Sequence, residues 1–248
     1  MMLKRKKSGI IIIGDEILSG KTQDTNSKFL SVQLGKRGVD VREIVVIPDS
    51  ENQIIKKVKA FSTNYDYVFT TGGIGPTHDD ITAYSISRAF KLNYTQNKEA
   101  KKILEKHYTK EELTEARLKM SYMPFGASLI YNPVSAAPGF VIRNVHVLPG
   151  VPMIMKPMVK EFLASFLQKN VLPQIRISTK LSEGIIGKFI GEIQKKYKDV
   201  LIGSYPYFKN ENFGVSLIIR GENKFTLEKA SKQIFDYLKS LSGEPNYF

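Results

Sequence analysis

One glycine-rich segment constrains the fold of this chain more than any other feature of its sequence. The segment reads TTGGIGPTHDDIT and spans residues 70–82. A short run of β-branched and aromatic residues, Tyr67–Phe69, precedes it, and a run with apolar residues at helical spacing, Ile81–Phe90, follows it. This order predicts a strand, a tight turn and a helix. Such a unit is typical of parallel sheets, in which the turn lies at the carboxyl end of the strand.

The residues of the turn indicate what this edge of the sheet can bind. Gly72, Gly73 and Gly75 carry no Cβ, so backbone N–H groups beside them can approach an anion closely. Asp79 and Asp80 follow at the expected start of the helix, where carboxylates could hold a divalent metal ion next to that anion. The turn therefore predicts a combined phosphate and metal site.

Predicted strands and helices alternate through the N-terminal two thirds of the chain. The expected strands lie at residues 9–14, 41–47, 66–71, 128–131, 139–142 and 145–148, with helices after each of the first three and a last helix at 153–167. A charged helical pattern occupies residues 97–120, with Thr109 and Glu112 as a capping box for its second helix. The alternation predicts an α/β fold with a doubly wound, mostly parallel sheet and right-handed crossovers.

A change in composition near residues 170–173 indicates a linker, so we expect domains at 8–170 and 174–248. The elements expected in the second domain are a strand at 175–179, a helix at 184–196, strands at 200–207 and 213–221, and a helix at 226–241. This order predicts a small α+β sandwich of the ferredoxin-like or KH-like kind. RNA binding is disfavoured, because the Gly-x-x-Gly motif at 184–187 follows a strand, whereas the KH loop lies between two helices.

Composition narrows the classes of protein to which this chain of 248 residues can belong. No apolar run approaches the roughly 20 residues that a transmembrane helix needs, so we expect no membrane contact, and residues 1–7 are expected to form a basic tail. The absence of cysteine excludes disulfides and thiolate chemistry and agrees with a cytoplasmic location. The net charge of +13 indicates an anionic ligand or partner, or only good solubility. Because the lysines are spread over expected solvent-facing positions, a nucleic-acid surface is less favoured.

Four segments combine glycine or proline turns with polar side chains at the ends of expected strands. They are residues 14–26, 70–82, 132–140 and 148–152. In doubly wound folds such strand ends converge on one crevice. Structural explanations stay open as well: Asp15 and Glu16 as solubilising loop residues, Asp24 and Asn26 as helix caps, and Asp80 as an N-cap.

These four segments, in this order, closely resemble the molybdopterin-binding (MoaB/Mog-type) domain, in the version found in the N-terminal part of CinA-type competence/damage-inducible proteins. The resemblance rests on GDEILxG with DTN, on TTGGIGPTxDDIT, on NP with APGF, and on LPGVP, and it covers about residues 8–168. The C-terminal module resembles, less specifically, the KH-like domain that follows in CinA-type proteins. His78 stands where many of those proteins have a further Asp, which leaves the number of metal carboxylates open.

The resemblance implies a three-layer α/β/α fold that binds a pterin or a dinucleotide pyrophosphate at this edge. In the molybdenum-cofactor branch, the acidic residue that matches Asp80 is implicated in adenylylating molybdopterin. The CinA-type domain is similar to one that hydrolyses ADP-ribose with a divalent metal ion and potassium, and the related domain of eukaryotic FAD synthase is linked to FAD hydrolysis. All of these reactions make or break a pyrophosphate joined to AMP, which suits a phosphate cradle with metal-binding carboxylates.

From the residues and the resemblance together, we expect a metal-dependent nucleotide pyrophosphatase acting on ADP-ribose or FAD-like substrates. Asp79 and Asp80 are the expected catalytic and metal-binding carboxylates, with Glu16 and Asp24 as further metal ligands, and Asp49 is a weaker candidate. The expected contacts to the nucleotide or pterin are Gly72, Gly73, Gly75, Thr82, Asp15, Asn26, Pro138, Gly139, Pro149 and Gly150. The expected cofactors are Mg²⁺, Mn²⁺ or Co²⁺, with K⁺, and molybdopterin is a further candidate ligand.

Two alternatives stay open at this point. The chain could hold molybdopterin or a nucleotide without turnover, or it could transfer an adenylyl group to molybdopterin in molybdenum cofactor biosynthesis. The fold is reused for each of these tasks, and a fold does not decide a function. The resemblance also implies a homo-oligomer, either a dimer or a trimer.

Overall fold

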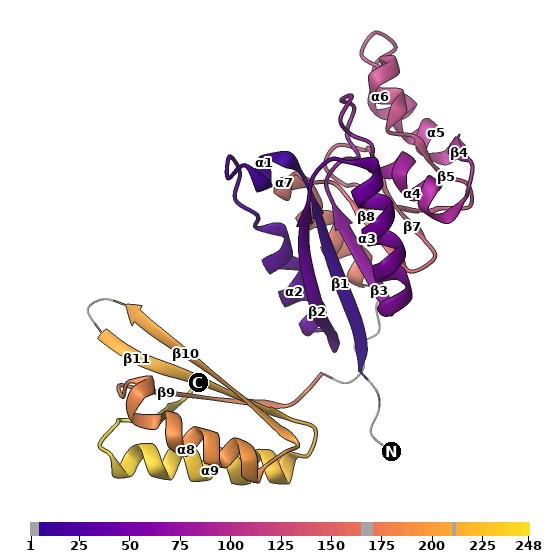
Figure 1. Ribbon diagram of the computed structural model, residues 1–248. Helices are drawn as coiled ribbons and strands as arrows, with labels where there is room; N and C mark the ends of the chain where they lie inside the picture. The colour runs from indigo at the N-terminus through magenta and orange to yellow at the C-terminus, as the bar shows by residue number, and fades with distance from the viewer. Residues whose placement is uncertain (1–4, 165–170, 210–211) are drawn as a thin grey trace. The chain divides into compact units, whose positions relative to one another are not determined.

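The computed structural model describes residues 5–164, 171–209 and 212–248, and the chain divides into two compact units between Val171 and Leu172 (Figure 1). The N-terminal unit is built on a six-stranded sheet. In spatial order its strands are β2 (Val39–Ile47), β1 (Lys6–Ile13), β3 (Tyr67–Thr71), β8 (Val145–Leu148), β7 (Gly139–Ile142) and β6 (Ser128–Ile130). The first four run parallel, whereas β7 is antiparallel to both of its neighbours. This confirms the predicted, mostly parallel sheet.

Strand β1 lies inside this sheet and pairs with β2 on one side and β3 on the other. Successive side chains of a strand point to opposite faces. Ile11 and Ile13 therefore join one core cluster, and Ile10 and Ile12 join the other. A continuous apolar run is what a parallel strand covered on both faces requires. Each buried isoleucine stabilises the fold by roughly 1.5–3 kcal/mol relative to an exposed one.

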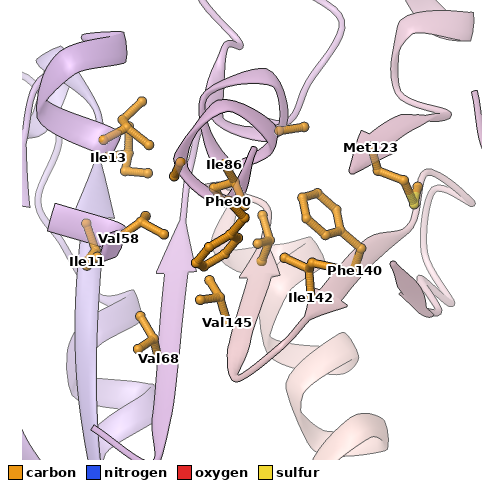
Figure 2. Close-up of a cluster of buried hydrophobic side chains, with 14 of the residues drawn as sticks. Ile11, Ile13, Val58, Val68, Ile86, Phe90, Met123, Phe140, Ile142 and Val145 are labelled. Atoms are coloured by element: carbon orange, nitrogen blue, oxygen red, sulfur yellow. The ribbon is translucent and has the colours of Figure 1, made fainter. Parts of the chain in front are cut away.

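Helices cover both faces of the sheet and complete the three-layer fold. They are α3 (Glu51–Asn64) and α4 (Thr82–Phe90) on one face, and α2 (Asn26–Gly35) and α7 (Pro152–Ala164) on the other. Figure 2 shows the first face, where Val58, Ile86 and Phe90 pack against the sheet. On the second face Leu30 and Met158 are fully buried. The expected end of the last helix at residue 167 lies outside the described residues.

Between α4 and β6 the chain forms a smaller unit, which consists of β4 (Tyr94–Gln96), α5 (Lys98–His107), α6 (Glu115–Lys119) and β5 (Tyr122–Pro124). The two strands pair antiparallel and were missed in the sequence, because each is only three residues long and neither Tyr-Thr-Gln nor Tyr-Met-Pro forms an apolar run. The capping-box prediction is wrong in one respect. Thr109 and Glu112 do form the reciprocal hydrogen bonds, but α6 begins later, where Thr114 Oγ1 accepts from the N–H of Arg117 at 3.3 Å.

Two segments near the N-terminus also differ from expectation. Lys6 and Lys7 were predicted to lie in a basic tail, but they are the first residues of β1 and pair with the start of β2. Both are exposed, so their charge costs little there. The loop expected after β1 begins with one helical turn, α1 (Asp15–Leu18), that has no side-chain cap.

The C-terminal unit is a four-stranded antiparallel sheet with two helices on one face. Its elements are β9 (Gln174–Thr179), α8 (Glu183–Lys196), β10 (Val200–Lys209), β11 (Asn212–Gly221), α9 (Lys224–Ser240) and β12 (Asn246–Tyr247). The spatial order is β10-β11-β9-β12. Ile186, Leu217 and Ile234 belong to the core between sheet and helices. The predicted β-α-β-β-α order is confirmed, and β12 adds a short edge strand. No helix among the described residues is both long and apolar enough to cross a bilayer.

Candidate functional site

The glycine turn after β3 is closely packed, which explains two of its glycines. Gly72 and Gly73 adopt positive φ angles of 108° and 67°. A Cβ on Gly72 would lie 2.0 Å from the carbonyl oxygen of Ile13, and a Cβ on Gly73 would lie 2.2 Å from Thr82 Oγ1. Only glycine fits both positions. The turn therefore packs tightly against the end of β1 and the start of α4.

The backbone N–H groups of this turn have two different roles. Gly72 donates to the carbonyl oxygen of Leu148 at 3.1 Å and so extends the sheet. Within the described part of the chain, the N–H groups of Gly73, Ile74 and Gly75 make no hydrogen bond. The N–H of Gly72, the first glycine of the predicted phosphate cradle, is therefore used within the sheet. The N–H groups of the next three residues remain available to a ligand.

Thr77 links the two carboxylates that follow the turn. Its N–H donates to Asp80 Oδ2 at 2.8 Å, and its hydroxyl lies 2.6 Å from the same oxygen and also contacts Asp79 Oδ1. Lys119 donates to the carbonyl oxygen of Thr77 at 2.5 Å. The Thr77 hydroxyl is the main cause that lowers the pKa of Asp79, and the charges of His78 and Lys119 act in the same direction. Asp79 is therefore ionised at neutral pH.

Asp80 does not serve as a helix cap. The N-cap position of α4 is Ile81, and no side chain caps the helix there. The carboxylate of Asp80 instead accepts from Thr77 and borders the open cleft. A Cβ on Gly75 would lie 2.7 Å from Asp80 Oδ2, so the third glycine of the turn leaves room for this carboxylate.

Asp49, which follows β2, lies among other negative charges. It accepts a hydrogen bond from the N–H of Asp15 at 3.1 Å. Burial is the main cause that raises the pKa of Asp49, and the charges of Asp15, Glu16 and Asp79 raise it further. These carboxylates share one electrostatic region, which favours a cation. The sequence signal for Asp49 was its position at the carboxyl end of a strand.

Asp24 and Asn26 hold the surrounding loops. Asp24 Oδ1 accepts from the N–H groups of Asn26 at 2.8 Å and Ser27 at 3.1 Å, the first two residues of α2, although the N-cap position itself is Thr25. The Asn26 side chain is 5% exposed and donates to the carbonyl oxygen of Gly150 at 2.7 Å. A Cβ on Gly150 would lie 3.3 Å from the Cα of Gly72. Asn26 therefore holds the Pro-Gly-Val-Pro turn against the glycine turn.

Together these segments enclose a cleft of about 660 Å³ at the carboxyl edge of the sheet. The predicted residues that line it are Glu16, Gly72, Gly73, Gly75, Asp79, Asp80, Pro149 and Gly150, and Asp49 joins them. The other predicted residues are not part of its lining: Asp15, Asp24, Asn26, Thr82, Pro138 and Gly139. The volume is typical of sites for small molecules, which span about 300–1,000 Å³.

Two of the residues outside the lining, Thr82 and Gly139, have clear local roles. Thr82 is fully buried under the turn and donates its N–H to the carbonyl oxygen of Gly73 at 2.9 Å. A Cβ on Gly139 would lie 2.3 Å from the carbonyl oxygen of Val147, so this glycine permits the pairing of β7 with β8. Pro138 borders a smaller cavity next to the cleft.

The cationic side of the site has no distinct signal in the sequence. Tyr108 and Arg117 both line the cleft, and the guanidinium carbon of Arg117 lies 4.3 Å from the centre of the Tyr108 ring. Lys119 reaches Thr77 from α6. All three come from a charged stretch whose sequence shows only helical spacing. The positive charges of Arg117 and Lys119 are suited to an anionic ligand.

The carboxylates form no complete metal cage. In the described ranges, no three His, Asp or Glu side chains come together in an arrangement that could hold a metal ion. Mg²⁺ can be held by one or two protein carboxylates, because it keeps several waters and is often shared with substrate phosphates. One or two of the carboxylates that line the cleft, such as Asp79 and Asp80, would therefore suffice for an ion that is shared with a phosphate group.

Comparison with known proteins identifies two family matches. Residues 9–169 match the family described as a probable molybdopterin binding domain, and residues 174–245 match the middle domain of FAD synthase. The crystal structure of CinA from Thermoplasma acidophilum, a protein described as having unknown function, is 32% identical. It superimposes with a TM-score of 0.62 over 66% of this chain and 99% of that one.

Two relatives align with nearly the whole chain. A protein from Archaeoglobus fulgidus is 35% identical over 229 residues, covering 92% of this chain and 96% of its own length. A probable FAD synthase from Caenorhabditis elegans is 36% identical over 253 residues, covering 92% of this chain and 49% of its own length. The chain thus spans about half the length of that relative.

Proposed function

Because the chain belongs to the family of molybdopterin binding domains, we propose that its cleft binds a nucleotide pyrophosphate and hydrolyses it with a divalent metal ion. One observation carries this proposal: the available N–H groups of the glycine turn and a group of carboxylates border the same cleft. The likeness to a protein named probable FAD synthase supports a substrate of the FAD or ADP-ribose kind.

In this proposal each group has a task that follows from its chemistry. The N–H groups of Gly73, Ile74 and Gly75 bind phosphate oxygens. Asp79 and Asp80 would hold Mg²⁺, Mn²⁺ or Co²⁺ beside the phosphates, and K⁺ would serve as a second cation. When bound, the metal ion neutralises negative charge that develops on the phosphates.

The hydrolysis itself needs a water molecule and a group that takes its proton. The water oxygen attacks one phosphorus atom while the bond from that phosphorus to the bridging oxygen breaks. The products are AMP and the phosphate ester of the other half. Asp49 is the proposed proton acceptor, because its raised pKa makes it a stronger base than an ordinary carboxylate.

A second candidate function is binding without turnover, with molybdopterin or a nucleotide as the ligand. The observation that favours it is the lack of a three-ligand metal cage among the described residues. Adenylyl transfer to molybdopterin is a further possibility within the same chemistry. A ligand that stays bound through purification, with no product formed, would distinguish binding from catalysis.

The deciding experiment is a mass-spectrometric screen for AMP release. Purified protein is incubated with ADP-ribose, FAD, NAD or ATP, in the presence of K⁺ and Mg²⁺, Mn²⁺ or Co²⁺, beside an Asp80→Asn variant. We expect AMP from at least one substrate and a large loss in the variant. AMP release that is equal in both proteins would contradict the role of Asp80.

Two further expectations concern the whole protein. We propose a cytoplasmic location and a homo-oligomer, either a dimer or a trimer. Light scattering of the purified chain gives its mass relative to the 28.1 kDa of one copy. A monomer across the micromolar range would contradict the oligomer.

A further inference from the structure

A second cavity adjoins the cleft at Asp80. Its volume is about 540 Å³, and Asp80 belongs to the lining of both hollows. Three tyrosines from three different elements line it: Tyr84 of α4, Tyr94 of β4 and Tyr122 of β5. The function proposed above uses none of these tyrosines.

The three tyrosine rings form one aromatic cluster. Tyr84 and Tyr94 have ring centres 5.6 Å apart in an edge-on arrangement, and Tyr94 and Tyr122 are also 5.6 Å apart. Burial is the main cause that raises the pKa of Tyr94, so this ring stays neutral. Tyr84 and Tyr122 are 39% and 36% exposed, so part of each ring faces the cavity or solvent. Exposed aromatic faces of this kind bind planar rings by stacking.

Charged groups lie where the two hollows meet, since Asp80 lines both of them and Lys119 lines the second. Gly75, Asp80, Tyr94, Tyr122 and Lys119 also border a small cavity of about 10 Å³, which has room for no more than one water molecule, so a ligand that reaches both hollows passes over the open surface at Asp80. Lys119 is also the residue that donates to Thr77. A positive charge at this point suits a pyrophosphate whose two ends lead into different cavities.

We propose that Tyr84, Tyr94 and Tyr122 bind the second planar ring of a dinucleotide whose pyrophosphate lies at Gly75 and Asp80. The inference rests on the proposed function and deepens it by naming the substrate class. That class is a dinucleotide with a planar ring on each side of the pyrophosphate, in preference to a sugar nucleotide with one ring. Each of the two cavities is large enough for one ring system.

Binding is the readout, because it does not depend on turnover. The full chain and its Tyr84→Ala/Tyr122→Ala variant are titrated calorimetrically with FAD and NAD, and with the half-molecules FMN and AMP. Tyr84→Phe/Tyr122→Phe keeps both rings and serves as the conservative control. Tyr131→Ala is the matched control, since Tyr131 is an exposed tyrosine of the same domain that borders neither cavity. Thermal unfolding verifies that each variant is folded.

We expect the double alanine variant to bind FAD about tenfold more weakly or worse, and to lose affinity for only one of the two halves. The phenylalanine and Tyr131 variants keep the original affinity. An unchanged FAD affinity, an equal loss for both halves, or no binding of either dinucleotide to the unaltered protein would overturn the inference. Hydrolysis is scored separately: binding that depends on the tyrosines with no AMP release would refute the proposed reaction and leave the ring site standing.

Discussion

The two domains cover their sheets differently. In the N-terminal domain helices pack on both faces of the sheet. The cleft with its polar groups therefore lies at the carboxyl ends of the strands. In the C-terminal domain α8 and α9 cover a single face. The opposite face of β10 carries Leu201 and Tyr205, which are 62% and 51% exposed.

The difference shows where a fold can place chemistry. When helices cover both faces of a parallel sheet, the carboxyl ends of its strands remain open to a ligand. The loops at these strand ends can place backbone N–H groups beside carboxylates. The cleft of the N-terminal domain uses this edge. The C-terminal domain has an open face, but within residues 172–209 and 212–248 no cluster of acidic side chains could hold a metal ion, so we expect it to contribute little to turnover. Four changes test or refine this contrast.

The largest expected effect comes from Gly72→Ala. The new Cβ would lie 2.0 Å from a carbonyl oxygen at a φ of 108°, so the free energy of unfolding of the N-terminal domain should fall by about 4 kcal/mol or more. Denaturant unfolding followed by circular dichroism measures it. Gly35→Ala in α2 is the control, because a Cβ there meets nothing within 4 Å. An equal loss in both variants would refute the packing argument.

Asp80→Asn should lower AMP release by roughly 10²–10³-fold, with little change in stability. The amide oxygen of asparagine can still accept from the N–H of Thr77, so the loop keeps its shape. Steady-state rates and melting temperatures measure the two effects. Asp236→Asn in the C-terminal domain is the matched control, because its carboxylate is exposed and pairs only with Lys232 among the described cations. If Asp236→Asn reduced the rate as much, the assignment of chemistry to one domain would fail.

The third change is one of pH and concerns His146. Burial lowers its pKa from 6.5 to about 4 in the folded protein. The unfolded chain therefore binds more protons between these values, and the stability that the neutral ring permits is lost as the pH falls from about 6.5 towards 4. We expect a loss of about 2 kcal/mol between pH 7 and pH 5.

Urea unfolding at several pH values measures this slope, and His146→Leu should reduce it. The three histidines of the chain lie at positions 78, 107 and 146, so the C-terminal domain has none and should lack the slope. A slope of the same size in the C-terminal transition would mean that His146 is not its cause.

The smallest expected effect is a gain in the C-terminal domain. Gly187→Ala lies within α8, and a Cβ there meets nothing within 4 Å. Alanine should raise the free energy of unfolding of this domain by up to about 1 kcal/mol. The denaturation midpoint of the C-terminal transition records it. A destabilisation would show that this glycine has a role the helix geometry does not reveal.

Most of the fold could be predicted from the sequence, because long apolar runs and glycine turns leave few alternatives. Ile10–Ile13 indicates a buried strand without further information. The strands β4 and β5 could not be predicted, since three residues show no period and their pairing depends on contacts across the intervening helices. Thr109 and Glu112 show a related limit, because local capping bonds form without a helix beginning there.

The site could be predicted only in part, because some of its residues are marked by local sequence and others only by contacts between distant parts of the chain. The glycines and Asp79 and Asp80 carry their chemistry in local sequence. Lys119 reaches Thr77 across 42 residues, and no spacing rule marks such a contact. Asp24 and Asn26 lie two residues apart, and only their hydrogen bonds show that their roles differ. Asp24 accepts from the start of α2, whereas the side chain of Asn26 donates to Gly150.

The bond from Asn26 to the carbonyl oxygen of Gly150 spans 124 residues, and it has a consequence for how the protein folds. Contacts between distant parts of a chain form slowly, because a long loop must close before they stabilise anything. The cleft should therefore be among the last regions to form, after β8 has joined the sheet. A nucleotide that recognises only the finished cleft would then slow unfolding and leave the folding rate almost unchanged.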